Sequence, residues 1–212
     1  MGMRKKYTRY IEKHAANIVG DLKGKFMLEL GDQELKGMKK ITIAKTGKEY
    51  YESKGVIHTS IDLNGRRGAL KFDLSQPIDM PEWINHFDII TNLGTTEHVE
   101  PQSSQYECFK NIHNFLKVGG IVIHVVPDIE IRKKHNFNTN HANNYYAESF
   151  FEMLTCDGIA YDLIDLTKSS YNFMVCMRKK SGLPFTDNRE LFDSHLIRGK
   201  GGKIWKGIND RV

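Results

Sequence analysis

The stretch FDIITNLGTTEHVEPQ, residues 87–102, and the stretch NFLKVGGIVIHVVP, residues 114–127, decide the fold of this chain. Each contains a short run of apolar, largely β-branched residues, which is typical of a buried strand. Between the two strands, one face of a predicted helix carries Tyr106, Phe109, Ile112, His113 and Leu116. That helix ends at Lys117, before a glycine pair that suits a C-terminal cap. The pattern predicts a strand, a covering helix and a second, parallel strand.

Towards the N-terminus, the same reading predicts further strands. They are FMLEL (26–30), VIHTSID (56–62) and GALKFD (68–73). An amphipathic helix precedes them within residues 1–24. Residues 32–55 are less clear: ITIA suits a short strand or a loop, and KEYYESKG from Lys48 suits a short helix that stops at Gly55.

Towards the C-terminus, a helix is predicted from Tyr145 to Cys156, followed by strands at 159–166 and 171–179. The link TKSS between these strands is too short for a parallel crossover, so they must pair antiparallel. The fold class is therefore α/β: a Rossmann-like three-layer sandwich with a mostly parallel seven-stranded sheet and an antiparallel final strand.

Residues 87–127 also carry a motif. A strand beginning FDxI is followed by a loop, Glu-His-Val, a helix and Leu-Lys-x-Gly-Gly. This order resembles the class I S-adenosylmethionine-dependent methyltransferases, and the resemblance covers roughly residues 20–180. It implies a methyltransferase-like domain over residues 1–182, with S-adenosylmethionine as cofactor. Residues 183–212 lie outside it and form a basic, Gly- and Lys-rich tail, expected to be extended or mobile.

The resemblance implies that the donor binds at the carboxyl ends of successive strands, where open parallel sheets bind ligands. The implied cofactor-binding residues are Glu29, Gly31, Asp32, Gln33, Asp62, Leu63, Asp73, Leu74, Asn92, Leu93 and Gly94. Asp62 would accept hydrogen bonds from the ribose, and Asp73 from the adenine amino group. Both also suit plain turn-capping carboxylates. Gln33 departs from the family pattern, which has a second loop glycine at this position, and this departure motivates the alternative of a degenerate, non-catalytic domain.

His98 and Glu97 are the candidate catalytic residues. His98 follows a strand end beside the donor and titrates near neutral pH, so it suits a base, with Glu97 as its orienting partner. The alternative is that Glu97 caps the next helix, which would open at Thr96, while His98 packs on the sheet. His135, His141 and Tyr145, in the polar segment after Pro127, are expected to contact the acceptor.

A metal is not expected, because no ligand spacing in the sequence demands one. As an alternative, Glu97, His98, His124 and one of the loop histidines could converge on a divalent ion. His124 alternates with apolar residues on a predicted core strand, which favours a buried core histidine.

Composition limits the partners only broadly. The net charge of +5 favours anionic partners weakly, and the three cysteines are widely spaced, as in proteins of a reducing compartment. No secretory signal is visible and no apolar run is long enough to span a bilayer, so a cytoplasmic protein without membrane contact is expected.

The predicted function is methyl transfer to an oxygen or nitrogen of a small-molecule acceptor. The alternatives are an RNA or other nucleic-acid methyltransferase using the basic tail, which is not favoured, and a degenerate, non-catalytic binding domain. The oligomeric state is left open.

Overall fold

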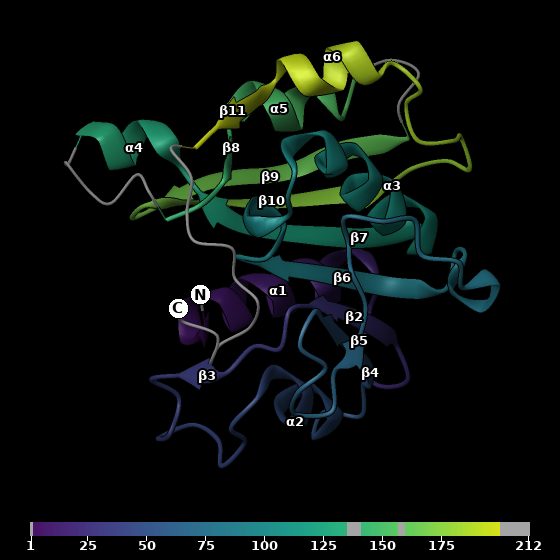
Figure 1. Ribbon diagram of the computed structural model, residues 1–212. Helices are drawn as coiled ribbons and strands as arrows, with labels where there is room; N and C mark the ends of the chain where they lie inside the picture. Colours follow the sequence, from purple (N-terminus) through teal and green to yellow (C-terminus); the bar gives the residue numbers. More distant parts are fainter. Residues whose placement is uncertain (1, 135–140, 157–159, 200–212) are drawn as a thin grey trace.

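The computed structural model describes residues 2–134, 141–156 and 160–199. Its centre is a seven-stranded sheet (Figure 1). The strand order is β5 (Leu70–Lys71), β4 (Ile57–Asp62), β2 (Phe26–Leu30), β6 (Phe87–Leu93), β7 (Leu116–Pro127), β10 (Asn172–Lys179) and β9 (Tyr161–Ser169). The first five strands run parallel, and β10 runs antiparallel to both of its neighbours. The predicted fold class, with its reversed final strand, is confirmed.

Helices cover both faces of this sheet, as the apolar clusters show. On one face pack α1 (Lys5–Ile18) and α2 (Gly47–Glu52), whose buried side chains include Ile11 and Tyr51. On the other pack α3 (Gln105–Phe115), α5 (Glu148–Met153) and α6 (Arg189–Ser194), through rings such as Phe109, Phe150 and Phe192. The strands between are buried on both sides, which accounts for their continuous apolar runs. No helix in the described part of the chain is both long and apolar enough to cross a membrane.

Short elements complete the chain between these layers. Strand β1 (Met3–Arg4) pairs in parallel with β3 (Leu35–Lys36), and β8 (Asn144–Tyr146) pairs antiparallel with β11 (Leu196–Arg198). Helix α4 (Ile129–Lys134) follows β7. The described residues also form the 3₁₀ turns η1 (Pro81–Trp83), η2 (Thr96–His98) and η3 (Gln102–Ser104).

Several predicted boundaries are wrong. The helix expected to open at Thr96 begins only at Gln105, after η2 and η3. Tyr145 lies in strand β8, and the helix expected from it begins at Glu148. The hairpin link is shorter than TKSS, because β9 continues to Ser169. Of the two alternatives for ITIA, the loop is confirmed: the segment forms no strand, and its Ile43 is fully exposed.

The expectation of an extended tail from Leu183 is wrong for residues 183–199. This segment contains α6 and β11, and Phe192 on α6 is fully buried. Its ring lies 5.3 Å from that of Phe150 and 5.7 Å from that of Phe109, centroid to centroid. The segment therefore belongs to the core, and the remaining tail residues, 200–212, lie outside the described residues.

Candidate functional site

A cavity of about 190 Å³ lies at the carboxyl ends of β2, β4, β5 and β6. After β2 the chain builds β4 and β5 on one side and then returns to place β6 on the other. The sheet order thus reverses beside β2, and open α/β sheets bind ligands at such a point. The cavity is lined by Gly31, Asp32, Gln33, Ile61, Asp62, Leu63, Asn64, Phe72, Asp73, Leu74, Gly94, Thr95, His98, Val99 and His141.

Gly31 begins the loop after β2 in a conformation that other residues rarely adopt, with φ of +85°. A Cβ atom here would press against Thr95 Oγ1 and come within 2.9 Å of Gln33 Nε2. Thr95 cannot easily retreat, since its hydroxyl donates to Leu30 O at 2.7 Å. The missing side chain therefore keeps the floor of the cavity open.

Asp62 and Asp73 both line this cavity together with Gly31, as the sequence predicts. Asp62 Oδ2 accepts from the Asp32 amide at 3.1 Å, and Asp62 Oδ1 accepts from the Asn64 amide at 3.0 Å. Asp73 Oδ1 accepts from the Ser75 amide at 2.9 Å. Both residues thus cap turns and also line the cavity, so the two interpretations of the sequence are compatible.

Two further predicted residues, one in the loop after β2 and one in β2 itself, make ionic or polar contacts. Asp32 is buried, which raises the pKa of its carboxyl group, while the Arg67 guanidinium 3.4 Å away acts in the opposite direction. Glu29 does not line the cavity; it is buried beneath the loop, where its Oε1 accepts from the Gln33 amide at 3.1 Å. Glu29 therefore fixes the loop from below.

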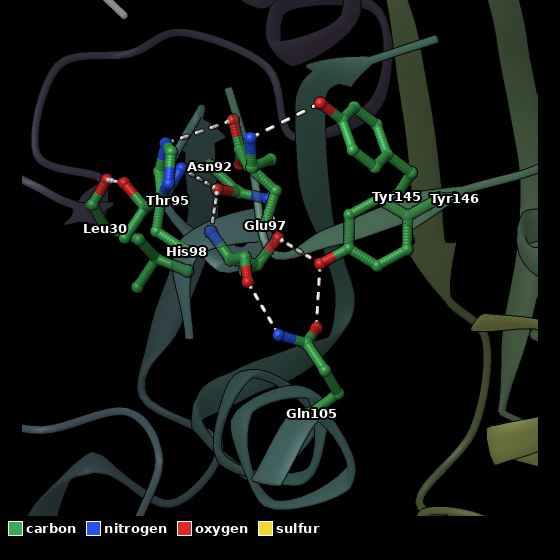
Figure 2. A network of polar contacts seen from close by, with 10 residues as sticks. Leu30, Asn92, Thr95, Glu97, His98, Gln105, Tyr145 and Tyr146 are labelled. Atoms are coloured by element: carbon green, nitrogen blue, oxygen red, sulfur yellow. Dashed lines mark hydrogen bonds and ion pairs between the residues drawn. The ribbon is translucent and has the colours of Figure 1, made fainter. Parts of the chain in front are cut away.

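Of the three predicted residues at the end of β6, only Gly94 lines the cavity. Leu93 is fully buried in the core on the α1 side of the sheet. Asn92 is also fully buried, and its Oδ1 accepts from the amides of Thr95 and Thr96 at 3.1 and 3.2 Å. Asn92 thus shapes the loop through its hydrogen bonds (Figure 2) and does not line the cavity.

A buried polar chain fixes the turn that carries Glu97 and His98 (Figure 2). Asn92 Nδ2 donates to Thr96 Oγ1 at 2.8 Å, and the hydroxyls of Thr96 and Tyr146 are hydrogen-bonded at 3.0 Å. Tyr146 donates to Gln105 Oε1 at 2.8 Å, and Gln105 Nε2 donates to Thr96 O at 2.7 Å. Such a connected network in a dry interior restricts the turn to one geometry.

The candidate catalytic pair lies at one end of the cavity with a third ionisable group. One ligand atom each of Glu97, His98 and His141 lies within 4.8 Å of the others. Burial raises the pKa of Glu97 to about 7 and lowers that of His98 to about 3 and of His141 to about 4. Glu97 is fully buried, whereas His98 and His141 line the cavity. The helix-cap alternative for Glu97 is wrong, because α3 begins only at Gln105.

The remaining candidates lie elsewhere. Tyr145 is fully buried and does not line the cavity; its hydroxyl accepts from the Ala142 amide at 3.3 Å. His124 is a buried core residue, with Nδ1 3.0 Å from Asn92 Nδ2. His135 lies outside the described residues.

Sequence reasoning did not identify the lining residues Ile61, Asn64, Phe72, Thr95 and Val99. Each stands next to, or two positions from, a residue that was predicted to be in the site. The available signal was therefore their place in the strand-end loops, since their chemical types alone point to no ligand.

No protein-family model and no curated protein matches the sequence. Among solved structures, the 1,6-didemethyltoxoflavin-N1-methyltransferase of Burkholderia thailandensis, with bound 1,6-didemethyltoxoflavin and S-adenosylhomocysteine, is similar with 15% identity and a TM-score of 0.50; the match covers 84% of this chain and 82% of that one. The N-methyltransferase NodS of Bradyrhizobium japonicum, in complex with S-adenosylhomocysteine, has 13% identity and a TM-score of 0.52 over 84% and 89% of the two chains. A TehB-like methyltransferase of Corynebacterium glutamicum has 16% identity and a TM-score of 0.52 over 81% and 86%. The chain therefore has the fold of the class I S-adenosylmethionine-dependent methyltransferases.

Proposed function

We propose that the protein is a methyltransferase that uses S-adenosylmethionine to methylate an oxygen or nitrogen of a small-molecule acceptor. The observation that carries the proposal is that Gly31, Asp62 and Asp73, from the ends of three neighbouring strands, line one cavity where the strand order reverses. Two proteins of the same fold hold S-adenosylhomocysteine, and one of them also holds 1,6-didemethyltoxoflavin.

The lining residues suit such a donor. Asp62 and Asp73 each accept backbone hydrogen bonds but, as carboxylates, keep lone pairs for ribose hydroxyls and an adenine amino group. Leu63 and Leu74 follow them and offer apolar surface to a flat ring. At the other end of the cavity, the loops at Gly31 and Gly94 would hold the amino-acid part of the donor.

The altered glycine loop is compatible with donor binding. Gln33, which replaces the second glycine, has its amide held by Glu29 below the loop. The position that most requires a missing side chain, Gly31, is still glycine. This arrangement favours a working donor site over a degenerate, non-catalytic domain.

When bound, the donor supplies a sulfonium-activated methyl group, so the main task of the protein is alignment. Holding the two reactants in line can supply about 7–11 kcal/mol of the barrier. His98 faces the cavity, and its lowered pKa keeps the imidazole neutral and able to accept a hydrogen bond from an acceptor hydroxyl or amine. Glu97 lies behind it, with Oε1 3.8 Å from His98 Nε2 and a raised pKa. A small side-chain rotation that closes this distance would let Glu97 take up, through the imidazole, the proton that leaves the acceptor.

Isothermal titration calorimetry with S-adenosylhomocysteine tests donor binding. We expect the wild-type protein to bind one equivalent, and Asp62→Asn to lower the affinity tenfold or more because the amide offers only one acceptor oxygen. Asp21→Asn is the matched control: Asp21 also accepts from the amide two residues on, at 3.1 Å, but does not line the cavity.

The proposal fails if the wild-type protein binds no S-adenosylhomocysteine at millimolar concentration. It also fails if Asp21→Asn weakens binding as much as Asp62→Asn does. The acceptor is then sought by incubating the protein with the labelled donor and pools of small hydroxyl- and amine-bearing molecules, with oligonucleotides as the competing class.

A further inference from the structure

Glu97 places a carboxylate in the interior, where burial raises its pKa and outweighs the positive charge of Arg132, which acts to lower it. The residue is fully buried, and neither carboxylate oxygen has a hydrogen-bond partner among the residues that the structure describes. The ring nitrogen Nε2 of His98, at 3.8 Å, is beyond hydrogen-bond distance. Burying a charged or polar group without a partner is costly, so this carboxylate is poised for a cation that comes from outside the chain.

Two imidazoles converge on the same point. His98 and His141 lie edge to face, with ring centroids 5.1 Å apart, and the three ligand atoms lie within 4.8 Å of one another. A tetrahedral ion with bonds of about 2.0–2.1 Å needs ligand atoms about 3.3 Å apart, so small side-chain rotations complete the geometry. The buried network through Asn92, Thr96 and Tyr146 holds the turn that supplies two of the three ligands.

We propose that Glu97, His98 and His141 bind one divalent transition-metal ion. Two imidazole nitrogens and one carboxylate suit Zn²⁺, Co²⁺, Fe²⁺ or Ni²⁺, whereas Mg²⁺ and Ca²⁺ prefer all-oxygen ligands. Cysteine does not contribute: Cys108 and Cys176 are buried, and neither they nor Cys156 belong to this group or line the cavity.

The ion would be accessible from one side. Glu97 is buried behind the site, while His98 and His141 line the cavity, so any remaining coordination position opens into that cavity. Three protein ligands with one open position are typical of a catalytic rather than a structural metal site. This role rests on the proposed function, but with the ion bound His98 and Glu97 act as its ligands and no longer accept the hydrogen bond and proton of the acceptor. The acceptor then presents an oxygen ligand to the ion, and hydroxyl-bearing molecules are favoured over amines.

Calorimetry with metal salts on chelator-treated full-length protein tests the site. We expect one equivalent of Zn²⁺ to bind, and bound Co²⁺ to give visible d–d absorption, while Mg²⁺ at the same concentration gives no heat. His141→Ala and Glu97→Gln should each weaken Zn²⁺ binding tenfold or more. His195→Ala is the matched control, because His195 lies on the end of α6 and does not line the cavity.

The outcomes separate this inference from the proposed function. Thermal unfolding first establishes that each variant is folded. If Zn²⁺ does not bind, or if His195→Ala weakens binding as much as His141→Ala, the metal site is refuted. S-adenosylhomocysteine is titrated into the same samples, so a protein that binds the nucleoside but no metal overturns only the inference. A protein that binds metal but no nucleoside overturns only the proposed function.

Discussion

At the scale of single residues, Gly31 is the position where a small change should have the largest effect on the cavity. Gly31→Ala forces a side chain into positive φ, which costs about 1–2 kcal/mol. It also presses on Thr95, whose hydrogen bond to Leu30 O is worth about 1 kcal/mol. We expect chemical denaturation to show both losses together, and calorimetry to show S-adenosylhomocysteine affinity lowered at least tenfold.

Gly24→Ala is the control for this change. Gly24 has φ of +77° but nothing within 4 Å of an added Cβ. The Gly24→Ala protein should therefore lose only the stability that the positive φ costs, and should bind the nucleoside as tightly as wild type. Equal losses of stability in the two variants would mean that the contact with Thr95 contributes nothing.

The sequence predicts that these strand-end residues meet at one place, because the carboxyl ends of parallel strands lie at the same edge of a sheet. Gly31, Asp62 and Asp73 follow apolar runs, and each pattern is local in the chain. The predicted residues that do not line the cavity differ from these. Tyr145 and Leu93 carry side chains that suit a site equally well, but long-range packing buries them, and no local pattern reports that packing.

At the scale of elements, the η2 turn depends on a strand far along the chain. Tyr146 on β8 links Thr96 to Gln105 on α3. The side-chain oxygen Oε1 of Gln105 can only accept a hydrogen bond, so the Tyr146 hydroxyl donates to it. The Thr96 hydroxyl therefore donates to the Tyr146 oxygen. The sequence predicts a helix that opens at Thr96, but the structure has a 3₁₀ turn there. Hydrogen bonds from β8 and α3 support this turn, and because Tyr146 of β8 is distant in the chain, the local pattern does not report it.

Tyr146→Phe should therefore lower the free energy of unfolding by about 1–3 kcal/mol, because Gln105 Oε1 is left buried without a donor. Tyr51→Phe is the matched control: this hydroxyl is buried and has no hydrogen-bond partner among the described residues, so its removal should be neutral or stabilising. Urea denaturation of both variants measures the difference, and a Tyr146→Phe protein as stable as wild type would show that the network does not fix the turn.

At the scale of the whole molecule, the sequence predicts the layers and the direction of every strand in the sheet, yet it places the edge of the domain too early. Alternating strands and helices define a parallel sheet through rules that do not depend on individual contacts. Those rules do not predict residues 183–199, because a six-residue helix and a three-residue strand are too short to show a detectable hydrophobic periodicity. Only their packing against distant aromatic rings shows that they belong to the core.

Phe192→Ala tests whether the segment is part of that core. Phe192 is fully buried against rings of α3 and α5, so truncation should cost about 3–5 kcal/mol, the usual range for a buried phenylalanine. Leu191→Ala, at a neighbouring exposed position, should cost less than about 0.5 kcal/mol.

Truncation tests the same segment as a whole. A chain ending after Gly182 also loses the pairing of β11 with β8, so its denaturation midpoint should lie below that of Phe192→Ala. A chain ending after Gly199 keeps every described contact and is the control. If the chain ending after Gly182 is as stable as the full chain, residues 183–199 do not stabilise the fold, and the domain ends at residue 182 as the sequence predicts.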